Sequence, residues 1–191
     1  MITEEDIPVL LSVGKDNVYI WEKGETRLHE NEAAEILREM CQGEYMHPTP
    51  VKEGKIELVA DIDGLLKVDS DKMKKVNGMR ELMIASRHGN FAVKKGDKLA
   101  GTRIIPLVIE REKMEQAKAV CEGEPILELK PFVHKKVGIV TTGNEVYYHR
   151  IEDTFTPVIK EKLAEYDTEV IGQEICNDDH EKITKAILSF I

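Results

Sequence analysis

The spacing of apolar residues predicts two helices near the start of the chain. Thr3 and Asp6 have the capping pattern that begins a helix, and an apolar stripe follows until Gly14 supplies a left-handed stop. Residues 30–40 repeat apolar positions at i, i+3, i+4 and i+7, which is typical of one face of a second helix. The apolar run at 17–21 favours a strand between the two helices.

Alternating apolar and polar residues then predict a β-rich region. Glycines and prolines over 43–54 indicate a connection, after which the alternation from Ile56 to Ile62, the pair Asp63–Gly64 and the resumption at Leu66 predict a β-hairpin. The fold class expected for this part is α+β, a small antiparallel β unit with peripheral helices. Its other expected elements are a short helix over 71–76, strands over 82–85, 91–93 and 99–109, and a helix over 111–120.

The pattern changes in the last third of the chain, where strands and helices alternate. Residues 137–140 form a continuous apolar run, typical of a parallel strand buried on both faces. Asp153 or Thr154 caps a helix, a strand follows over 169–175, and Asn177–Asp179 opens a last helix. This order predicts the start of a doubly wound α/β domain.

Two domains are therefore expected, with the boundary near Gly123 and Pro125. Residues 1–125 form the β-rich domain and residues 136–191 the α/β domain. Sheets typically hold about five or six strands, so the two strands expected in 136–191 indicate a partial domain. Either a second chain completes it or this sequence is a fragment, and we favour the fragment.

Composition and charge narrow the function classes. Hydrophobic residues make up 41% and charged residues 33% of the 191 positions, and neither a membrane-spanning run nor a secretory signal occurs, so a cytoplasmic protein is expected. The formal net charge of -9 disfavours nucleic-acid binding. The three cysteines lie far apart and have no zinc-site spacing, which argues against a disulfide framework and fits a reducing compartment.

Three polar clusters follow the expected strands or open the expected helices: 141–145, 152–154 and 177–179. In open α/β sheets ligands bind beyond the carboxyl ends of the strands. Gly143 allows a close approach of the backbone, and carboxylates beside an anionic ligand suggest Mg²⁺ or an oxyanion-handling site. The alternative is structural: Asp153 and Asp178 are helix N-caps, and 142–144 is a turn.

The run Gly138-Ile-Val-Thr-Thr-Gly-Asn-Glu145, followed by Asp153 and then Asp178–Asp179, resembles the molybdopterin-binding domain of MoeA-type insertases, gephyrin E and MogA/MoaB-like proteins. The resemblance covers about 136–191. It implies molybdopterin as ligand, with Mg²⁺ and molybdate, and a molybdopterin molybdotransferase-like activity in a full-length form. The implied cofactor-binding residues are Thr141, Thr142, Gly143, Asn144, Glu145, Asp153, Asp178 and Asp179, with Glu145 and Asp153 also holding metal.

The sequence differs from the family pattern at two places, and the resemblance extends to two earlier segments. Phe155 replaces a usual asparagine, and the later T-G-G-x-S-x-x-x-D segment of the family is absent. The segments 65–69 and 94–107 are similar to a MoeA-like branch of prokaryotic molybdopterin-binding proteins. Molybdoenzyme apoproteins and a homo-oligomer are the implied partners.

Two other functions are open at this point. CinA-type proteins place a related domain beside nucleotide hydrolase or amidase activity, although their motif lies near the amino terminus. The third hypothesis is a non-catalytic oligomerisation module. Arg103, on a strand of apolar neighbours, is expected either to reach a phosphate or to form a structural ion pair.

Overall fold

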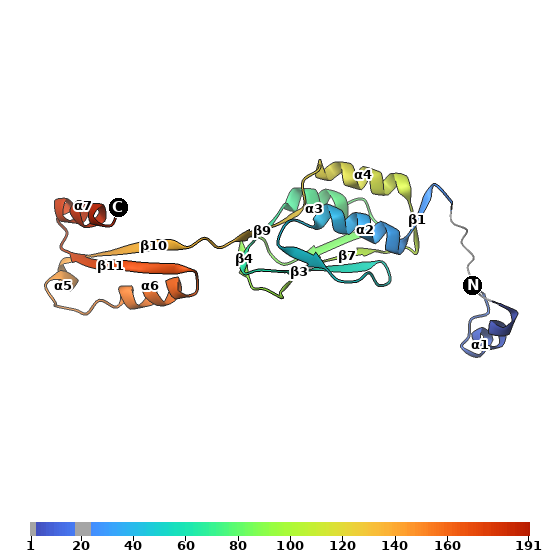
Figure 1. Ribbon diagram of the computed structural model, residues 1–191, viewed down its shortest axis with the longest axis horizontal. Coiled ribbons are helices and arrows are strands. Elements are labelled where there is room, and N and C mark those ends of the chain that lie inside the picture. The colour runs from blue at the N-terminus through green and yellow to red at the C-terminus, as the bar shows by residue number, and fades with distance from the viewer. Residues whose placement is uncertain (1–2, 18–23) are drawn as a thin grey trace.

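The computed structural model describes residues 3–17 and 24–191 (Figure 1). A short η1 turn (Glu4–Asp6) leads into helix α1 (Ile7–Ser12). The Asp6 carboxylate accepts hydrogen bonds from the Thr3 amide and hydroxyl, and Gly14 has a φ of 75°, so the predicted start and stop of this helix are confirmed. The predicted strand at 17–21 falls almost wholly on residues 18–23, outside the described residues.

The middle of the chain contains three antiparallel sheets and three helices. The strand orders are β2-β3-β7-β5 in the four-stranded sheet, β6-β4-β9 in the three-stranded sheet and β1-β8 in the smallest. The helices are α2 (Glu30–Cys41), α3 (Ser70–Asn77) and α4 (Arg111–Cys121). The strands are β1 (Arg27–His29), β2 (Met46–Pro48), β3 (Lys55–Ala60), β4 (Gly64–Val68), β5 (Leu82–Ser86), β6 (Phe91–Val93), β7 (Lys98–Ile104), β8 (Val108–Glu110) and β9 (Leu127–Pro131).

The predicted hairpin across Asp63–Gly64 is wrong, although both of its strands exist. β3 pairs with β2 and β7, whereas β4 pairs with β6 and β9, so the chain passes from one sheet to the other at this point. Neither Asp63 nor Gly64 has the positive φ that a type I′ turn requires. A Cβ on Gly64 would lie 2.5 Å from the carbonyl oxygen of Lys130, so this glycine permits the close approach of β9.

One hydrophobic core joins these sheets and helices. Its buried members run from Leu28 to Leu129, and Leu37, Ile56 and Leu66 are among the fully buried side chains. The apolar stripe of α2 packs against β7 and α4, as its i, i+3, i+4 spacing predicts. Because β9 pairs with β4 and contributes to this core, the compact middle region extends to Pro131.

The last part of the chain forms a separate, two-stranded parallel sheet, β10 with β11. Figure 1 shows helices α6 and α7 on opposite sides of this strand pair. The predicted order of strand, helix, strand, helix is confirmed. The bounds are β10 (Lys135–Thr142), α5 (Asn144–Tyr147), α6 (Phe155–Ala164), β11 (Thr168–Cys176) and α7 (His180–Ser189).

Burial in this last part differs from the expectation. No residue of β10 is buried, so the prediction of a strand buried on both faces is wrong. The reason is the size of the sheet, because two strands with one helix on each side leave much apolar surface uncovered. Phe155 on α6 is 76% exposed.

The end of α7 packs closely on the strand pair. Gly138 and Gly172 are register partners on β10 and β11, and the ring of Phe190 lies over both of them. A Cβ on Gly138 would lie 2.3 Å from Cγ of Phe190, and one on Gly172 would lie 2.6 Å from its Cε1. The two glycines therefore form the flat surface on which the end of α7 docks.

Within the described residues, no helix has both the length and the apolar content needed to cross a membrane.

Candidate functional site

The candidate site lies at the edge where β10 and β11 both end. Thr142, the last residue of β10, is the register partner of Cys176, the last residue of β11. The Gly143 amide donates a hydrogen bond to the Cys176 carbonyl oxygen at 3.2 Å. The parallel pairing thus brings two of the predicted polar clusters, 141–145 and 177–179, to one rim of the sheet.

Asp153 joins the third cluster to this rim. Its carboxylate accepts hydrogen bonds from the amides of Phe155 and Thr156, both at 3.0 Å, and from the Thr156 hydroxyl at 2.5 Å. The Thr141 hydroxyl lies 3.3 Å from the same carboxylate and 2.9 Å from the Thr156 hydroxyl. The hydrogen bonds from Thr156 are the main cause that lowers the pKa of Asp153, so this group stays ionised at neutral pH.

Sequence reasoning missed three members of this network. Thr156 is 3% exposed on the first turn of α6, and Gln173 on β11 donates to both Asp153 (2.9 Å) and Thr156 (3.0 Å). Lys160 donates in turn to the Gln173 side-chain oxygen at 3.2 Å. The available signal was Gln173 within an otherwise apolar and small-residue stretch of the strand, Val170-Ile-Gly-Gln173.

Gly143 and Asn144 connect the first loop to the third cluster. Gly143 has a φ of 142°, a conformation that L side chains rarely adopt, and a Cβ there would lie 2.9 Å from a carboxylate oxygen of Glu145. The Asn144 side-chain amide donates a hydrogen bond to the Asp178 carboxylate at 2.7 Å. This hydrogen bond fixes the loop after β10 against the loop after β11.

Two of the predicted carboxylates also have a structural role. Asp179 accepts hydrogen bonds from the amides of Glu181 and Lys182 and is the N-cap of α7. These amides lower its pKa, the bond from Glu181 being the larger cause. The cap expected at Asp178 therefore lies one residue later, whereas Asp153 does cap the first amides of α6.

A hollow of about 510 Å³ lies beside Asp153 and is lined by α5, by the loop that follows it and by β11. Its volume is within the roughly 300–1,000 Å³ of small-ligand pockets, and Arg150 and His149 give it cationic or polar lining. At the same rim, the side-chain oxygen of Asn177 is buried and has no hydrogen-bond partner among the residues that the structure describes. An unsatisfied buried acceptor of this kind fits a ligand that carries N–H donors. The residues that line the hollow are Val146, His149, Arg150, Ile151, Glu152, Asp153 and Ile175.

The described part of the chain holds no group of three or more His, Cys, Asp or Glu side chains that could bind a metal ion. The Asp153 oxygens accept five hydrogen bonds within the network, and the Glu145 carboxylate lies against Gly143. The Asp153 carboxylate is thus occupied within the hydrogen-bond network of the rim.

Neither the curated proteins nor the solved structures gave a match to this chain. Residues 138–191, which contain α5 to α7, β11 and the last five of the eight residues of β10, match the MoCF_biosynth family, described as a probable molybdopterin-binding domain. The segment that forms the rim is thus a partial molybdopterin-binding domain.

Proposed function

We propose that the rim at the ends of β10 and β11 binds molybdopterin, and that the chain acts in the synthesis or insertion of the molybdenum cofactor. The observation that carries this proposal is the Asn144–Asp178 hydrogen bond, which joins two loops of the matched segment at the edge where α/β sheets bind ligands. The family match supports a role in cofactor biosynthesis, and the contacts of the named residues support this rim as its site.

In this proposal, different residues of the rim bind different parts of molybdopterin. The Thr142 hydroxyl faces the phosphate side, where a hydroxyl donor suits an anion. Thr141, whose hydroxyl is bonded to Asp153 and Thr156, and Gly143, whose amide donates to the Cys176 carbonyl, hold the loop in place for the ligand. Asn177 offers its buried, unpartnered oxygen to the N–H groups of the pterin. Bound molybdopterin supplies the dithiolene sulfurs that hold molybdenum, which is cargo rather than a resident metal.

Asp153 and Glu145, the two carboxylates expected to bind metal, have different roles in this proposal. Asp153 would have to give up hydrogen bonds from Thr141, Thr156 and Gln173 to bind Mg²⁺, so we assign it a positioning role. Glu145 then stays as the proposed carboxylate ligand of Mg²⁺, since hard cations prefer oxygen. Molybdotransferase-like activity, transfer of the cofactor to molybdoenzyme apoproteins and the contribution of Asp179 belong to the same proposal.

A second candidate function, oligomerisation, is favoured by the uncovered apolar surface of this part. Phe155 on α6 and Leu188 on α7 are 76% and 62% exposed. Apolar surface of this kind commonly marks a protein interface. In that case light scattering would give an associated species whose mass is indifferent to molybdopterin.

The proposed function is tested by equilibrium binding of molybdopterin to the full chain under anaerobic conditions. Asn144→Asp places a carboxylate against Asp178, and we expect about a tenfold loss of affinity, because one hydrogen bond is replaced by like-charge repulsion. The double variant Asn144→Asp with Asp178→Asn restores a donor and an acceptor in exchanged positions. We therefore expect it to recover most of the binding.

Glu161→Gln is the matched control, because it removes one exposed carboxylate from α6 outside the network. Its affinity should equal that of the unchanged chain. Absence of molybdopterin binding by the unchanged chain would refute the proposal, as would equal affinities in all four proteins.

A further inference from the structure

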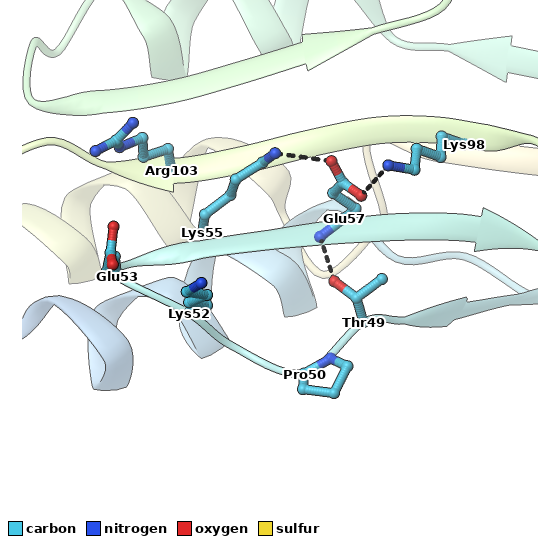
Figure 2. Close-up of a pocket in the computed structure, with 8 residues that line it drawn as sticks. All are labelled: Thr49, Pro50, Lys52, Glu53, Lys55, Glu57, Lys98 and Arg103. Carbon is cyan, nitrogen blue, oxygen red and sulfur yellow. Dashed lines mark hydrogen bonds and ion pairs between the residues drawn. The ribbon is translucent and has the colours of Figure 1, made fainter.

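A second, basic hollow of about 450 Å³ lies on the outer face of the four-stranded sheet (Figure 2). We propose that it binds the phosphate group of a small molecule. This inference is independent of the molybdopterin site, which lies on another sheet. The lining residues that carry the argument are Lys52, Lys55, Lys98, Arg103, Glu53 and Glu57.

Strand register creates the hollow. Lys55 and Glu57 on β3 have Arg103 and Gly101 as their partners on β7. Gly101 carries no side chain, so the strand pair has a gap between Arg103 and Lys98 on this face. A register shift after Leu58 then brings Lys98 opposite Val59. The result is a depression with cationic side chains at both ends.

The charges in this hollow are not balanced. Glu57 is bonded to Lys55 and Lys98, with the side-chain nitrogens of both at 2.7 Å. Hydrogen bonds from Lys55 and Lys98 lower the pKa of Glu57 to about 2, so the carboxylate is occupied and ionised. Within residues 3–17 and 24–191, neither Lys52 nor Arg103 has an ion-pair partner.

The sequence left two roles open for Arg103, a structural ion pair or a phosphate contact, and the described residues do not provide the ion pair. Figure 2 shows its guanidinium beside the hollow with no interaction drawn to it. Four cations share the hollow with the two carboxylates of Glu53 and Glu57, in a chain whose net charge is -9. A guanidinium and an ammonium group that line one hollow and have no ion-pair partner among the described residues suit a phosphate, which accepts several charge-assisted hydrogen bonds.

The backbone holds the basic residues in place before any ligand binds. Lys52 and Lys55 exchange two backbone hydrogen bonds (3.0 and 2.9 Å), and Glu53 and Gly54 between them have φ values of 50° and 66°, as in a type I′ turn. Asn31 accepts a hydrogen bond from the Gly54 amide at 2.9 Å, and the Gly54 carbonyl accepts one from Ile104 at 3.0 Å. A turn tied to both α2 and β7 reduces the ordering cost of binding.

The size and charge of the hollow favour a small molecule over a nucleic acid. Its volume falls in the range of small-ligand pockets, and the basic residues form one local cluster rather than a long stripe. The overall negative charge would repel an extended phosphate backbone. We therefore expect a compact phosphorylated metabolite.

Calorimetric titration of the full chain with inorganic phosphate and with pyrophosphate tests this site. We expect binding at millimolar or lower concentration, and about a tenfold loss of affinity in Arg103→Gln and in Lys52→Gln. Glu57→Gln should strengthen binding several-fold, because it releases two lysines from a carboxylate. A purely structural role of these residues would not produce a gain.

Lys75→Gln, at an exposed lysine of α3, is the matched control for loss of one positive charge and should bind as the unchanged chain does. Thermal unfolding of each variant confirms that it is folded. The proposal is overturned if neither anion binds, or if Arg103→Gln and Lys52→Gln bind like Lys75→Gln. Tighter binding of a single-stranded oligonucleotide, lost in Arg103→Gln, would also overturn it in favour of a nucleic-acid surface.

Discussion

At the residue scale, hydrogen-bond partners determine what each predicted carboxylate does. Asp153, Asp178 and Asp179 belong to similar acidic clusters in the sequence, yet they have three different environments. Asp153 organises a partly buried network, Asp178 accepts from Asn144, and Asp179 caps α7. A role in ligand binding is therefore best tested at Asn144 and Asp178, whose hydrogen bond joins the two loops, and a role in stability is best tested at Asp153.

Asp153→Asn should destabilise the last part of the chain at neutral pH, because an amide cannot accept all the donors that the carboxylate accepts. The folded-state pKa of Asp153 lies below its ordinary value of 3.8. Its stabilisation is therefore present above pH 3.8 and is lost as the pH falls through the lower folded pKa. Urea unfolding of both proteins at neutral pH and below pH 3.8 measures this. A difference that persists unchanged in acid would contradict the assignment.

His134 gives a prediction of the opposite sign. Its ring nitrogen lies 3.0 Å from the Asp167 carboxylate, which is the main cause that raises its pKa above the ordinary 6.5. The stabilisation is therefore complete below pH 6.5 and is lost as the pH rises through the raised folded pKa. An NMR titration of the imidazole should show the raised pKa, and Asp167→Asn should lower it. Equal pKa values in the two proteins would exclude this ion pair.

The polar clusters of the site could be predicted from sequence, whereas their connections could not. The clusters can be recognised in the sequence because they follow apolar runs at the expected strand ends. Thr156, Gln173 and Lys160 lie inside a helix or a strand, where an isolated polar residue has the pattern of an ordinary solvent-facing position. Gln173 reaches Asp153 because the loop before α6 lies against β11, a tertiary contact that local sequence does not encode.

At the element scale, helices were easier to predict than strand partners. The expected helix at 30–40 is α2 within one residue at its end. Alternation in β3 and β4 correctly indicates strands, but a period of two identifies the buried face and not the neighbouring strand. The tight type I′ turn lies at Glu53–Gly54, in a segment taken as a connection, and not at Asp63–Gly64. Both pairs combine an acidic residue with glycine, so local sequence alone does not separate them.

The docking of α7 on the glycine pair leads to a mutational prediction. Gly138→Ala places a methyl group within the ring of Phe190, and we expect a loss of about 1–3 kcal/mol, the usual cost of overpacking. Phe190→Ala removes the ring that the methyl group would meet. In the double variant the alanine at 138 should therefore cost much less. Urea unfolding of the two single variants and the double variant measures the coupling, and simple additivity would contradict this contact.

At the scale of the whole molecule, burial is divided unevenly along the chain. The core cluster draws on residues from Leu28 to Leu129, whereas Gly143, Val146, Thr156, Cys176 and Ala186 are the buried residues described after Pro131. A two-stranded sheet with little buried surface has few contacts to resist opening. This contrast is the physical basis for regarding 136–191 as a distinct domain, which remains a proposal.

Hydrogen exchange measured by mass spectrometry should show the same contrast. We expect amides of β3 and β7 to exchange far more slowly than those of β10 and β11, because opening free energies follow local burial. Molybdopterin should slow exchange in the loops after β10 and β11. Equal protection of the two regions in the free protein would contradict this account of the molecule.

The most direct test of the molybdopterin site is an anaerobic NMR titration of the isotope-labelled full chain with molybdopterin. We expect the amide signals of Gly143, Asn144 and residues 177–179 to move together and to saturate. Any movement of signals around Lys52 and Arg103 should also appear with inorganic phosphate alone, because molybdopterin itself carries a phosphate group. Unchanged signals at both strand ends, or changes confined to the sheet that carries Arg103, would contradict the proposal that the rim of β10 and β11 binds this cofactor.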